Sequence, residues 1–435
     1  MRGKRTPRAR FLSALRGVLT SVLLGAQMGL LGGAAAAATA TAETELAGWL
    51  PPSNTVREIL LASPALQAAR SRRSAQGFQA EAIRAGAAET SLRSSLQLRR
   101  SRDRQEPFVE PVIAIERPIR AWGKEALDAN LAAQTLAAAQ IEYADVVHEA
   151  SRELLKHWFG HLRALIARQN AAAALTAAAQ LQQLARIRLQ RGELARLDVL
   201  LAEAETQRAE ANVHSAEGQL KGAESALRRL YPGLSPVDQV AGSALPVLAL
   251  DGVALVPEFL EKNHELNWRR ADAQRLRLLG QRFERDRLPD PIVGLYAASE
   301  RSGAEQLTGI SLQVPIAGAT RTANARAALA QAQSAAENLA RLEQELTAGF
   351  EARWAELNNR YKAAANLAAA ADKQARSAAS VRRAFAQGEF STAQVIQTER
   401  QAAELRTQAQ LEQLEVVALL AQLQLDLHQI WDFDD

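Results

Sequence analysis

The sequence predicts a mainly α-helical fold with a small β part, built from two repeats of a strand pair followed by a long coiled-coil hairpin of helices. Three observations support this prediction. The composition is rich in Ala, Leu, Gln, Arg and Glu, with only 5% aromatic residues, as in proteins made of long, closely packed helices. The same landmarks recur in both halves of the chain, and four short segments alternate apolar and polar residues.

Residues 1–42 have the features of a cleavable secretory signal peptide. The first ten residues, MRGKRTPRAR, include five basic side chains, and an apolar run and a tract of small residues follow. The tract ends in A-T-A at 40–42, which predicts cleavage before Glu43. The alternative is a retained membrane anchor, which the short run and the charge of Arg16 disfavour. We therefore expect export of a mature chain that begins at Glu43.

The charge balance gives no reason to expect nucleic-acid binding. The formal net charge is +4, from 52 basic and 48 acidic residues, but the signal holds six of the basic residues and no acidic one. The mature chain therefore carries 46 − 48 = −2. The lack of Cys excludes disulfides and a lipid attached to cysteine. After the signal, no stretch reaches the roughly 18 apolar residues of a spanning helix, so entry into a membrane would require strands.

An internal repeat divides the mature chain. Pro118 and Pro315 each lie between an alternating segment and a helical one, 315 − 118 = 197 residues apart. Gly192 and Gly388, in the similar stretches RGELARLDVL and QGEFSTAQVI, lie 388 − 192 = 196 residues apart. Because two landmarks keep nearly one spacing, we predict two copies of one unit. We place the first repeat at 43–235, a connection rich in turn-forming residues at 236–256, and the second repeat at 257–435.

Four segments of about ten residues predict β-strands. They begin at Ser91, Phe108, Asp290 and Glu305. In each, apolar and polar residues alternate, so that one face suits lipid and the other suits water. Two soluble hairpins that cover a core would show the same alternation. Four strands are too few to close a membrane barrel, whose smallest examples have about eight, so a spanning interpretation requires several copies of the chain to share one barrel.

Long helices are predicted between the landmarks of each repeat. Pro118 and Gly192 are 192 − 118 = 74 residues apart, and Pro315 and Gly388 are 388 − 315 = 73 residues apart. At ~1.5 Å per residue, each helix would extend roughly 110 Å. Apolar residues three or four apart indicate a coiled-coil seam. The return path after Gly192 is expected to be helical to about Leu230, irregular to about Val256 and helical again to Leu288, so that two shorter helices lie beside one long uninterrupted helix.

Four strands, two helical hairpins, a proline at each strand-to-helix change and two G-E-[LF] tips resemble the TolC family of outer-membrane efflux proteins. The similarity covers the whole mature chain and is greatest to the CzcC-like branch, which serves heavy-metal efflux by RND-type pumps. The resemblance implies a homotrimer in which a twelve-stranded transmembrane β-barrel tops an α-helical barrel. It also implies a place in the bacterial outer membrane, extending into the periplasm, with a periplasmic adaptor (membrane fusion) protein and an inner-membrane RND-type pump as partners.

The function implied is a passive exit duct that exports metal cations or small toxic molecules. Two alternatives fit the same sequence features. A type I protein secretion system uses the same kind of duct, and a periplasmic coiled-coil adaptor or scaffold would also be exported and rich in Ala. Adaptors usually carry one hairpin between β-domains, whereas this chain has two hairpins and few strands.

The resemblance also implies roles for particular residues. The family's P-L-F-x-G-G signature at strand-to-helix junctions corresponds to PIRAWG at 118–123 and PIAGAT at 315–320, without either Phe. These stretches mark the junctions as Pro118, Trp122, Pro315 and Gly318, with Trp122 as a substitute interfacial aromatic. The V-G-x-x-x-x-D-V tip pattern marks adaptor-docking residues Gly192, Glu193, Leu194, Asp198, Gly388, Glu389 and Phe390. The acidic gate position of relatives is occupied by Gln394, followed by Gln397, so these two are the candidate gate.

Several of these residues have a simpler structural explanation. Gly192 and Gly388 can end helices in the left-handed conformation. Ser391 and Gln394 can form a capping box, and Asp198 suits the dipole at a helix start. The alternation within the strands predicts that one set of side chains faces a barrel lumen: Arg93, Gln97, Arg99, Glu116 and Gln313.

The sequence contains no motif for catalysis or for a cofactor. There is no nucleophile elbow, Gly-rich phosphate loop or HExxH motif, so we predict no enzyme activity and no cofactor. His157 and His161 have the i, i+4 spacing of a metal-binding pair, but no third ligand lies near them in the sequence. We expect packed or solvated histidines there, and no metal site.

Overall fold

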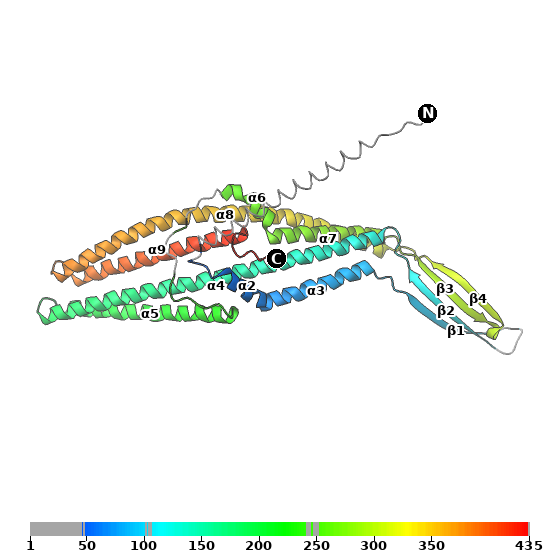
Figure 1. Ribbon diagram of the computed structural model, residues 1–435, viewed down its shortest axis with the longest axis horizontal. Helices are drawn as coiled ribbons and strands as arrows, with labels where there is room; N and C mark the ends of the chain where they lie inside the picture. The colour runs from blue at the N-terminus through cyan, green and yellow to red at the C-terminus, as the bar shows by residue number, and fades with distance from the viewer. Residues whose placement is uncertain are drawn as a thin grey trace, which may run out of the picture. The chain divides into compact units, whose positions relative to one another are not determined.

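The computed structural model describes residues 46, 48–100, 102, 107–240, 245–246 and 252–433 (Figure 1). The predicted signal peptide and its cleavage site lie outside the described residues, as do residues 241–244 and 247–251 of the predicted connection at 236–256. The described residues form two compact units. Unit 1 draws on Met1–Ser63, Glu149–Lys262 and Gly349–Asp435, and unit 2 on Pro64–His148 and Asn263–Ala348.

Helices and strands follow one another in the order expected from the repeat. Two helices, α2 (Ser53–Ala62) and α3 (Pro64–Ala85), precede the first strand pair, β1 (Ser91–Arg99) and β2 (Phe108–Pro118). The first hairpin consists of α4 (Lys124–Gln190) and α5 (Arg196–Leu230). The second repeat contains α6 (Gly252–Lys262), α7 (His264–Asp286), β3 (Ile292–Glu300), η2 (Arg301–Gly303), β4 (Glu305–Gln313), α8 (Ala319–Ala386) and α9 (Thr392–Asp426).

All four predicted strands are confirmed, and they form one antiparallel sheet in the order β1-β2-β3-β4. The predicted pairs are therefore joined by pairing between β2 and β3, with Ile115 opposite Leu295. The third strand begins at Ile292 rather than at Asp290, because Pro291 lacks the N–H that a ladder requires and the Asp290 side chain binds elsewhere. Within the described chain, β1 and β4 are the two edges of the sheet.

The two long helices are confirmed, with 67 residues in α4 and 68 in α8. At ~1.5 Å per residue, each contains about 100 Å of helix. Both are slightly shorter than the distance between the Pro and Gly landmarks, because a few residues after each Pro form the strand-to-helix connection. No helix among the described residues combines the length and the hydropathy that crossing a membrane requires.

The return path of the first repeat differs in detail from the prediction. Helix α5 ends at Leu230, as expected, but helical structure resumes at Gly252 rather than near Val256. It is then interrupted at Asn263, whose side chain accepts a hydrogen bond from the backbone N–H of Leu266 (2.8 Å) and caps α7. Asn competes with the helix for its own backbone, which is why it favours a cap at this point.

The core of unit 1 contains aromatic side chains from several segments. Phe259 of α6 stacks on Phe350 of α8, with ring centroids 4.6 Å apart, and both rings are fully buried. Trp158 of α4 donates a hydrogen bond to the carbonyl oxygen of Trp49 (2.7 Å). Packing of this kind attaches the short segments of the unit to its long helices.

Candidate functional site

The sheet has one apolar face that is exposed in the chain. Its side chains point to the same side because the register pairs Leu92 with Ile115, Ile115 with Leu295, and Leu295 with Ile310. Ile310 is 76% exposed, although isoleucine is among the residues most often found inside proteins. Large apolar side chains cover this face: Leu92, Leu96, Leu98, Val109, Ile113, Ile115, Val293, Leu295, Ile310 and Leu312.

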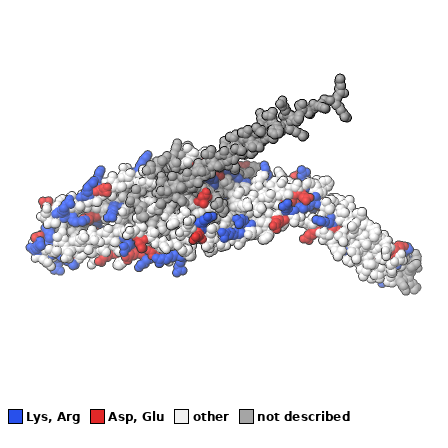
Figure 2. All heavy atoms as spheres, viewed as in Figure 1, with Lys and Arg blue, Asp and Glu red and all other residues white. Residues whose placement is uncertain are grey.

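The opposite face carries the predicted lumen residues. The register places Arg93, Gln97, Arg99, Glu116 and Gln313 together on this face. Arg93 forms an ion pair with Glu116 (2.8 Å), and Arg99 forms one with Glu110 (2.9 Å). On the side of the sheet that Figure 2 shows, few charged side chains are visible except near the loop end, whereas the helices in the same view carry many. The sheet thus has two chemically different faces.

A tyrosine covers the glycine of β4 on the polar face. Tyr296 and Gly309 are cross-strand partners, and a Cβ added to Gly309 would lie 2.6 Å from the Tyr296 hydroxyl oxygen. A side chain at position 309 would therefore displace the ring. An aromatic ring over a glycine stabilises strand register, and the sequence prediction did not identify this pair.

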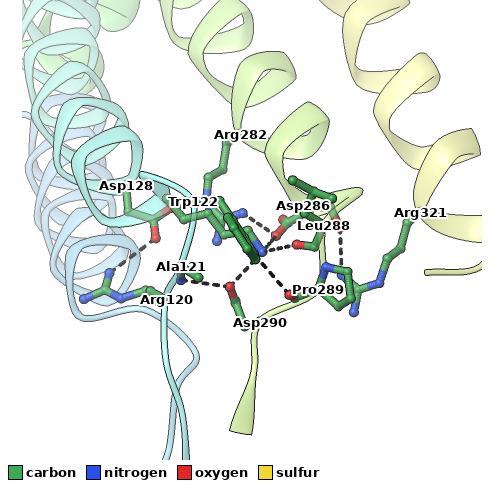
Figure 3. Close-up of polar contacts among 11 residues, drawn as sticks. Arg120, Ala121, Trp122, Asp128, Arg282, Asp286, Leu288, Pro289, Asp290 and Arg321 are labelled. Atoms are coloured by element: carbon green, nitrogen blue, oxygen red, sulfur yellow. Dashed lines mark hydrogen bonds and ion pairs between the residues drawn. The ribbon is translucent and has the colours of Figure 1, made fainter. Parts of the chain in front are cut away.

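The first strand-to-helix junction is held by a ladder of polar contacts (Figure 3). The backbone N–H of Ile119 donates to the Pro291 carbonyl (2.8 Å), and that of Ala121 donates to Asp290 Oδ1 (3.1 Å). The ring N–H of Trp122 donates to the Pro289 carbonyl (3.3 Å). Lys124 Nζ donates to the carbonyl of residue 288 (2.7 Å). The segments 119–124 and 288–291 are thereby joined residue by residue.

Lys124 is the fully buried member of this junction. Its Nζ lies 2.9 Å from Asp290 Oδ1 and 3.1 Å from Asp286 Oδ1, in addition to its carbonyl partner. Three acceptors therefore match the three protons of the ammonium group. A cation at the first residue of a helix opposes the helix dipole, so these acceptors are needed to retain it. Sequence analysis missed Lys124, Asp286 and Asp290, because their partners lie more than 160 positions away.

Two arginines extend the network. Arg282 contacts Asp128 (2.5 Å) and Asp286 (2.5 Å). Arg120 contacts Asp128 (3.3 Å) and donates to the carbonyl of residue 84 at the end of α3 (3.0 Å). Burial alone would raise the pKa of Asp286, but hydrogen bonds from Arg282 and Lys124 outweigh it and hold this pKa below its usual range.

The second junction has fewer contacts. Pro315 and Gly318 lie in a stretch without regular structure before α8, and Ile316 between them is 97% exposed. Arg321, the repeat counterpart of Lys124, donates to the backbone carbonyl of Asp286 (2.9 Å). The four predicted junction residues lie where each strand gives way to a helix, and among the described residues the polar contacts enclose the first junction more fully than the second.

The two hairpin tips have the same backbone turn. Gly192 and Gly388 have φ values of 75° and 93°, in the left-handed region that favours glycine. Each Gly N–H bonds three residues back, and the following Glu193 or Glu389 N–H bonds five residues back, to Arg188 or Ala384. This is the Schellman pattern of helix ends. The repeat seen in the sequence is therefore a repeat of local geometry.

The predicted docking residues at these tips differ in exposure. Gly192, Glu193, Gly388 and Glu389 are exposed, and Phe390 is exposed as well. Leu194 is half-buried and packs against two small apolar clusters, one around Leu181 and Phe385 and one around Ala185 and Val199. Asp198 is half-buried in the first turn of α5.

An arginine missed by the sequence analysis joins the two tips. Arg188, buried near the end of α4, donates to the Phe385 carbonyl (2.7 Å) and lies 5.0 Å from the centroid of the Phe385 ring. Its Nε also contacts Glu193 (3.3 Å). One side chain therefore bonds to both the end of α8 and the turn of its own hairpin.

The candidate gate residue Gln394 takes part in a capping box. Its side-chain oxygen accepts from the Ser391 N–H (3.0 Å), and the Gln394 N–H donates to the Ser391 hydroxyl (3.3 Å). The structural role predicted for Gln394 is therefore present. Gln397 is exposed on the same helix one turn later.

A second contact between hairpins lies on the returning helices. Glu205 of α5 is buried and forms ion pairs with Arg208 of its own helix and Arg400 of α9. Burial raises the pKa of Glu205, but hydrogen bonds from the two arginines outweigh it, and the pKa lies below its ordinary value. These residues line a hollow of about 1310 Å³ between the hairpins, in whose walls alanine is the commonest residue beside several long polar and charged side chains.

The two histidines at metal-pair spacing face different neighbours. His157 lies against the ring of Tyr231, with centroids 5.8 Å apart. His161 is fully buried, and its Nε2 lies 3.0 Å from the Val237 carbonyl. Their described contacts are those of packed histidines.

Comparison with known proteins gives matches in structure but not in sequence. No protein-family model matches the chain, and no curated protein matches it. The outer-membrane channel OprN superposes with a TM-score of 0.72 at 16% identity, covering 87% of this chain and 90% of that chain. The CmeC outer-membrane channel of Campylobacter jejuni gives 0.67 at 14%, covering 87% and 85%. The outer-membrane protein VceC of Vibrio cholerae gives 0.64 at 17%, covering 87% and 95%.

These similarities extend over nearly the whole length of each solved structure. At 14–17% sequence identity they establish the architecture. The chain has the fold of outer-membrane channels.

Proposed function

We propose that this protein is a passive exit duct of the bacterial outer membrane, a member of the TolC family that extends into the periplasm. The observation that carries the proposal is the sheet, with a broad exposed apolar face opposite a face that bears ion pairs. Such a sheet suits a wall between lipid and water. In a periplasmic scaffold such a sheet would be unfavourable, because its apolar face would remain in contact with water.

A homotrimer is the assembly that we propose. The meander β1-β2-β3-β4 runs antiparallel throughout and has β1 and β4 at its edges. The β4 edge of one copy can therefore continue antiparallel to the β1 edge of the next. Three copies would give twelve strands, an even number within the range of known membrane barrels of ~8 to 26. Closure would cover the edges and place Arg93, Gln97, Arg99, Glu116 and Gln313 around the lumen.

The hairpin tips are the proposed contact with a periplasmic adaptor, and through it with an inner-membrane RND-type pump. The tips present Glu193, Glu389 and Phe390 to solvent on two turns of equal geometry. The walls of the hollow between the hairpins contain many alanines, which would allow another helix to approach closely at those positions. Gln394 and Gln397 remain the candidate gate.

Metal cations or small toxic molecules are the proposed cargo, in keeping with the CzcC-like resemblance. A type I secretion duct would have the same fold. Energy for transport would come from the pump, because the duct itself carries out no chemical step.

Fractionation combined with crosslinking tests the proposal directly. We expect the mature protein in the outer-membrane fraction, with chemical crosslinks that yield dimers and trimers and no larger species. A soluble periplasmic monomer would refute the duct and favour the scaffold. Co-purification from crosslinked cells would then identify the adaptor and would separate an RND-type partner from a type I secretion partner.

A further inference from the structure

The two strand-to-helix junctions are counterparts in the repeat but differ in their contacts. In the first, the segment 119–124 makes hydrogen bonds to each of four consecutive residues, 288–291. Among the described residues, the stretch 314–317 of the second junction makes no hydrogen bond or ion pair of this kind. Its described links are the bond from the Arg321 side chain to the backbone carbonyl of Asp286 and the local bond from the Arg321 N–H to the Gly318 carbonyl (3.2 Å) at the start of α8. Hydrogen bonds to a neighbouring segment therefore hold the first connection in place, whereas the second connection makes few such bonds.

The backbone is strained at the first junction and not at the second, which is a further difference between them. Trp122 and Gly123 both have positive φ, 64° and 74°. A tryptophan in the left-handed region costs free energy and persists only where its surroundings fix it. Here the surroundings are the Pro289 carbonyl, which accepts from the Trp122 ring, and the buried Lys124. No residue at 315–320 has a positive φ.

The charges around Lys124 explain why the first junction is held firmly. Its two carboxylate partners come from different segments, Asp286 from the end of α7 and Asp290 from the stretch before β3. Arg282 and Asp128 close the network from α7 and α4 (Figure 3). Removing Lys124 would leave two carboxylates and a carbonyl without their shared donor, and the two segments would lose their central contact.

We propose that Lys124 is a pin that makes the first junction rigid and leaves the second junction, 314–318, as the hinge at which the start of α8 changes direction relative to β4. Sheet and helix would then move as one piece on the α4 side and independently on the α8 side. This division of roles between the two repeats is independent of what the duct carries.

Paired spin labels on the full-length protein test this proposal. The chain has no Cys, so labels attach only at introduced cysteines. One pair, Arg117→Cys with Ala129→Cys, spans the first junction. Its repeat counterpart, Val314→Cys with Arg326→Cys, spans the second, since 117 + 197 = 314 and 129 + 197 = 326. All four positions are exposed. Pulsed electron resonance on each pair measures the spread of distances across the junction.

We expect a narrow distance distribution for the first pair and a broad one for the second. Lys124→Met should broaden the first distribution and leave the second unchanged. Arg321→Met, the matched control, should leave the first distribution narrow. Equal widths at the two junctions in the otherwise unsubstituted chain would overturn the proposal, and this comparison remains available if Lys124→Met fails to fold. An unchanged first distribution in folded Lys124→Met would overturn it as well.

Discussion

Replacing Ile310 by arginine tests the assignment of the apolar face. Ile310 is the sixth of nine residues in β4, lies opposite Leu295 and is 76% exposed in the chain. In water, this substitution would replace an exposed apolar side chain by a charged one and leave folding little affected. In a barrel wall, it would place a guanidinium against lipid. The two environments therefore predict opposite outcomes.

The position of Ile310 along the strand determines how much free energy the substitution by arginine costs. It lies three residues from the end of β4, or about 10 Å at ~3.4 Å per residue. Arginine on the lipid face costs about 2–4 kcal/mol at the bilayer midplane and about 0–1 kcal/mol near the interfaces. We therefore expect roughly 2 kcal/mol per chain for Ile310→Arg, about a 30-fold change in the folding equilibrium. Leu312→Arg, one residue from the strand end, should cost about 1 kcal/mol or less.

Gln313→Arg is the matched control, because Gln313 is adjacent to Leu312 but lies on the polar face. The measurements are the amount of heat-resistant oligomer in the outer-membrane fraction and the urea midpoint for folding into lipid vesicles. The expected order of damage is Ile310→Arg, then Leu312→Arg, then Gln313→Arg with almost no effect. If Ile310→Arg assembles as well as Gln313→Arg, the apolar face does not meet lipid and the strand assignment to a membrane wall is wrong.

Three further predictions concern the hairpins. Arg188→Ala should weaken the tips by about 1–3 kcal/mol, because the Phe385 carbonyl loses a buried donor, and hydrogen exchange near residue 385 should accelerate. Ser391→Ala should destabilise the start of α9 by about 1 kcal/mol, and Ala195→Ser, at the uncapped start of α5, should stabilise that helix, both read by thermal melting. Glu205 has a lowered pKa, so its ion pairs stabilise the fold above its ordinary pKa and are lost as the pH falls through the lower folded value. Glu205→Gln should make the free energy of unfolding depend less on pH between the lowered folded pKa of Glu205 and its ordinary value. Urea unfolding at a series of pH values measures this dependence.

The strands and long helices were predictable because their signals are local. Alternation in the segment from Glu305 and the proline at 315 define the end of β4, and Gly192 and Gly388 define the ends of α4 and α8. Such features depend on backbone conformation and on periodicity, which a sequence shows directly. The break at Asn263 was missed because an Asn within a helical pattern is common, and only the cap geometry reveals its role.

The junction network was not predictable in the same way. Lys124 follows a glycine and precedes a glutamate, a context that is usual for a solvated lysine at a helix start. Its acceptors, Asp286 and Asp290, come from the other repeat. The pairing of β2 with β3, which no local pattern specifies, brings the two segments together. A buried ion pair between distant segments therefore leaves no periodic trace in the sequence.

Comparison of the repeats shows which contacts were duplicated. Within each hairpin, Arg186 pairs with Glu203 (2.7 Å) and Arg382 pairs with Glu399 (2.6 Å), at positions 196 apart. The contact of Lys124, which joins one repeat to the other, has no such copy in the described part of the chain: Lys124 is buried beside two aspartates, whereas its counterpart Arg321 donates to a backbone carbonyl. A contact within a repeat is preserved by duplication, because both partners are copied together. A contact between repeats has to arise once, in a chain that already holds both copies, so these asymmetric residues are where the two halves of the protein can acquire different mechanical roles.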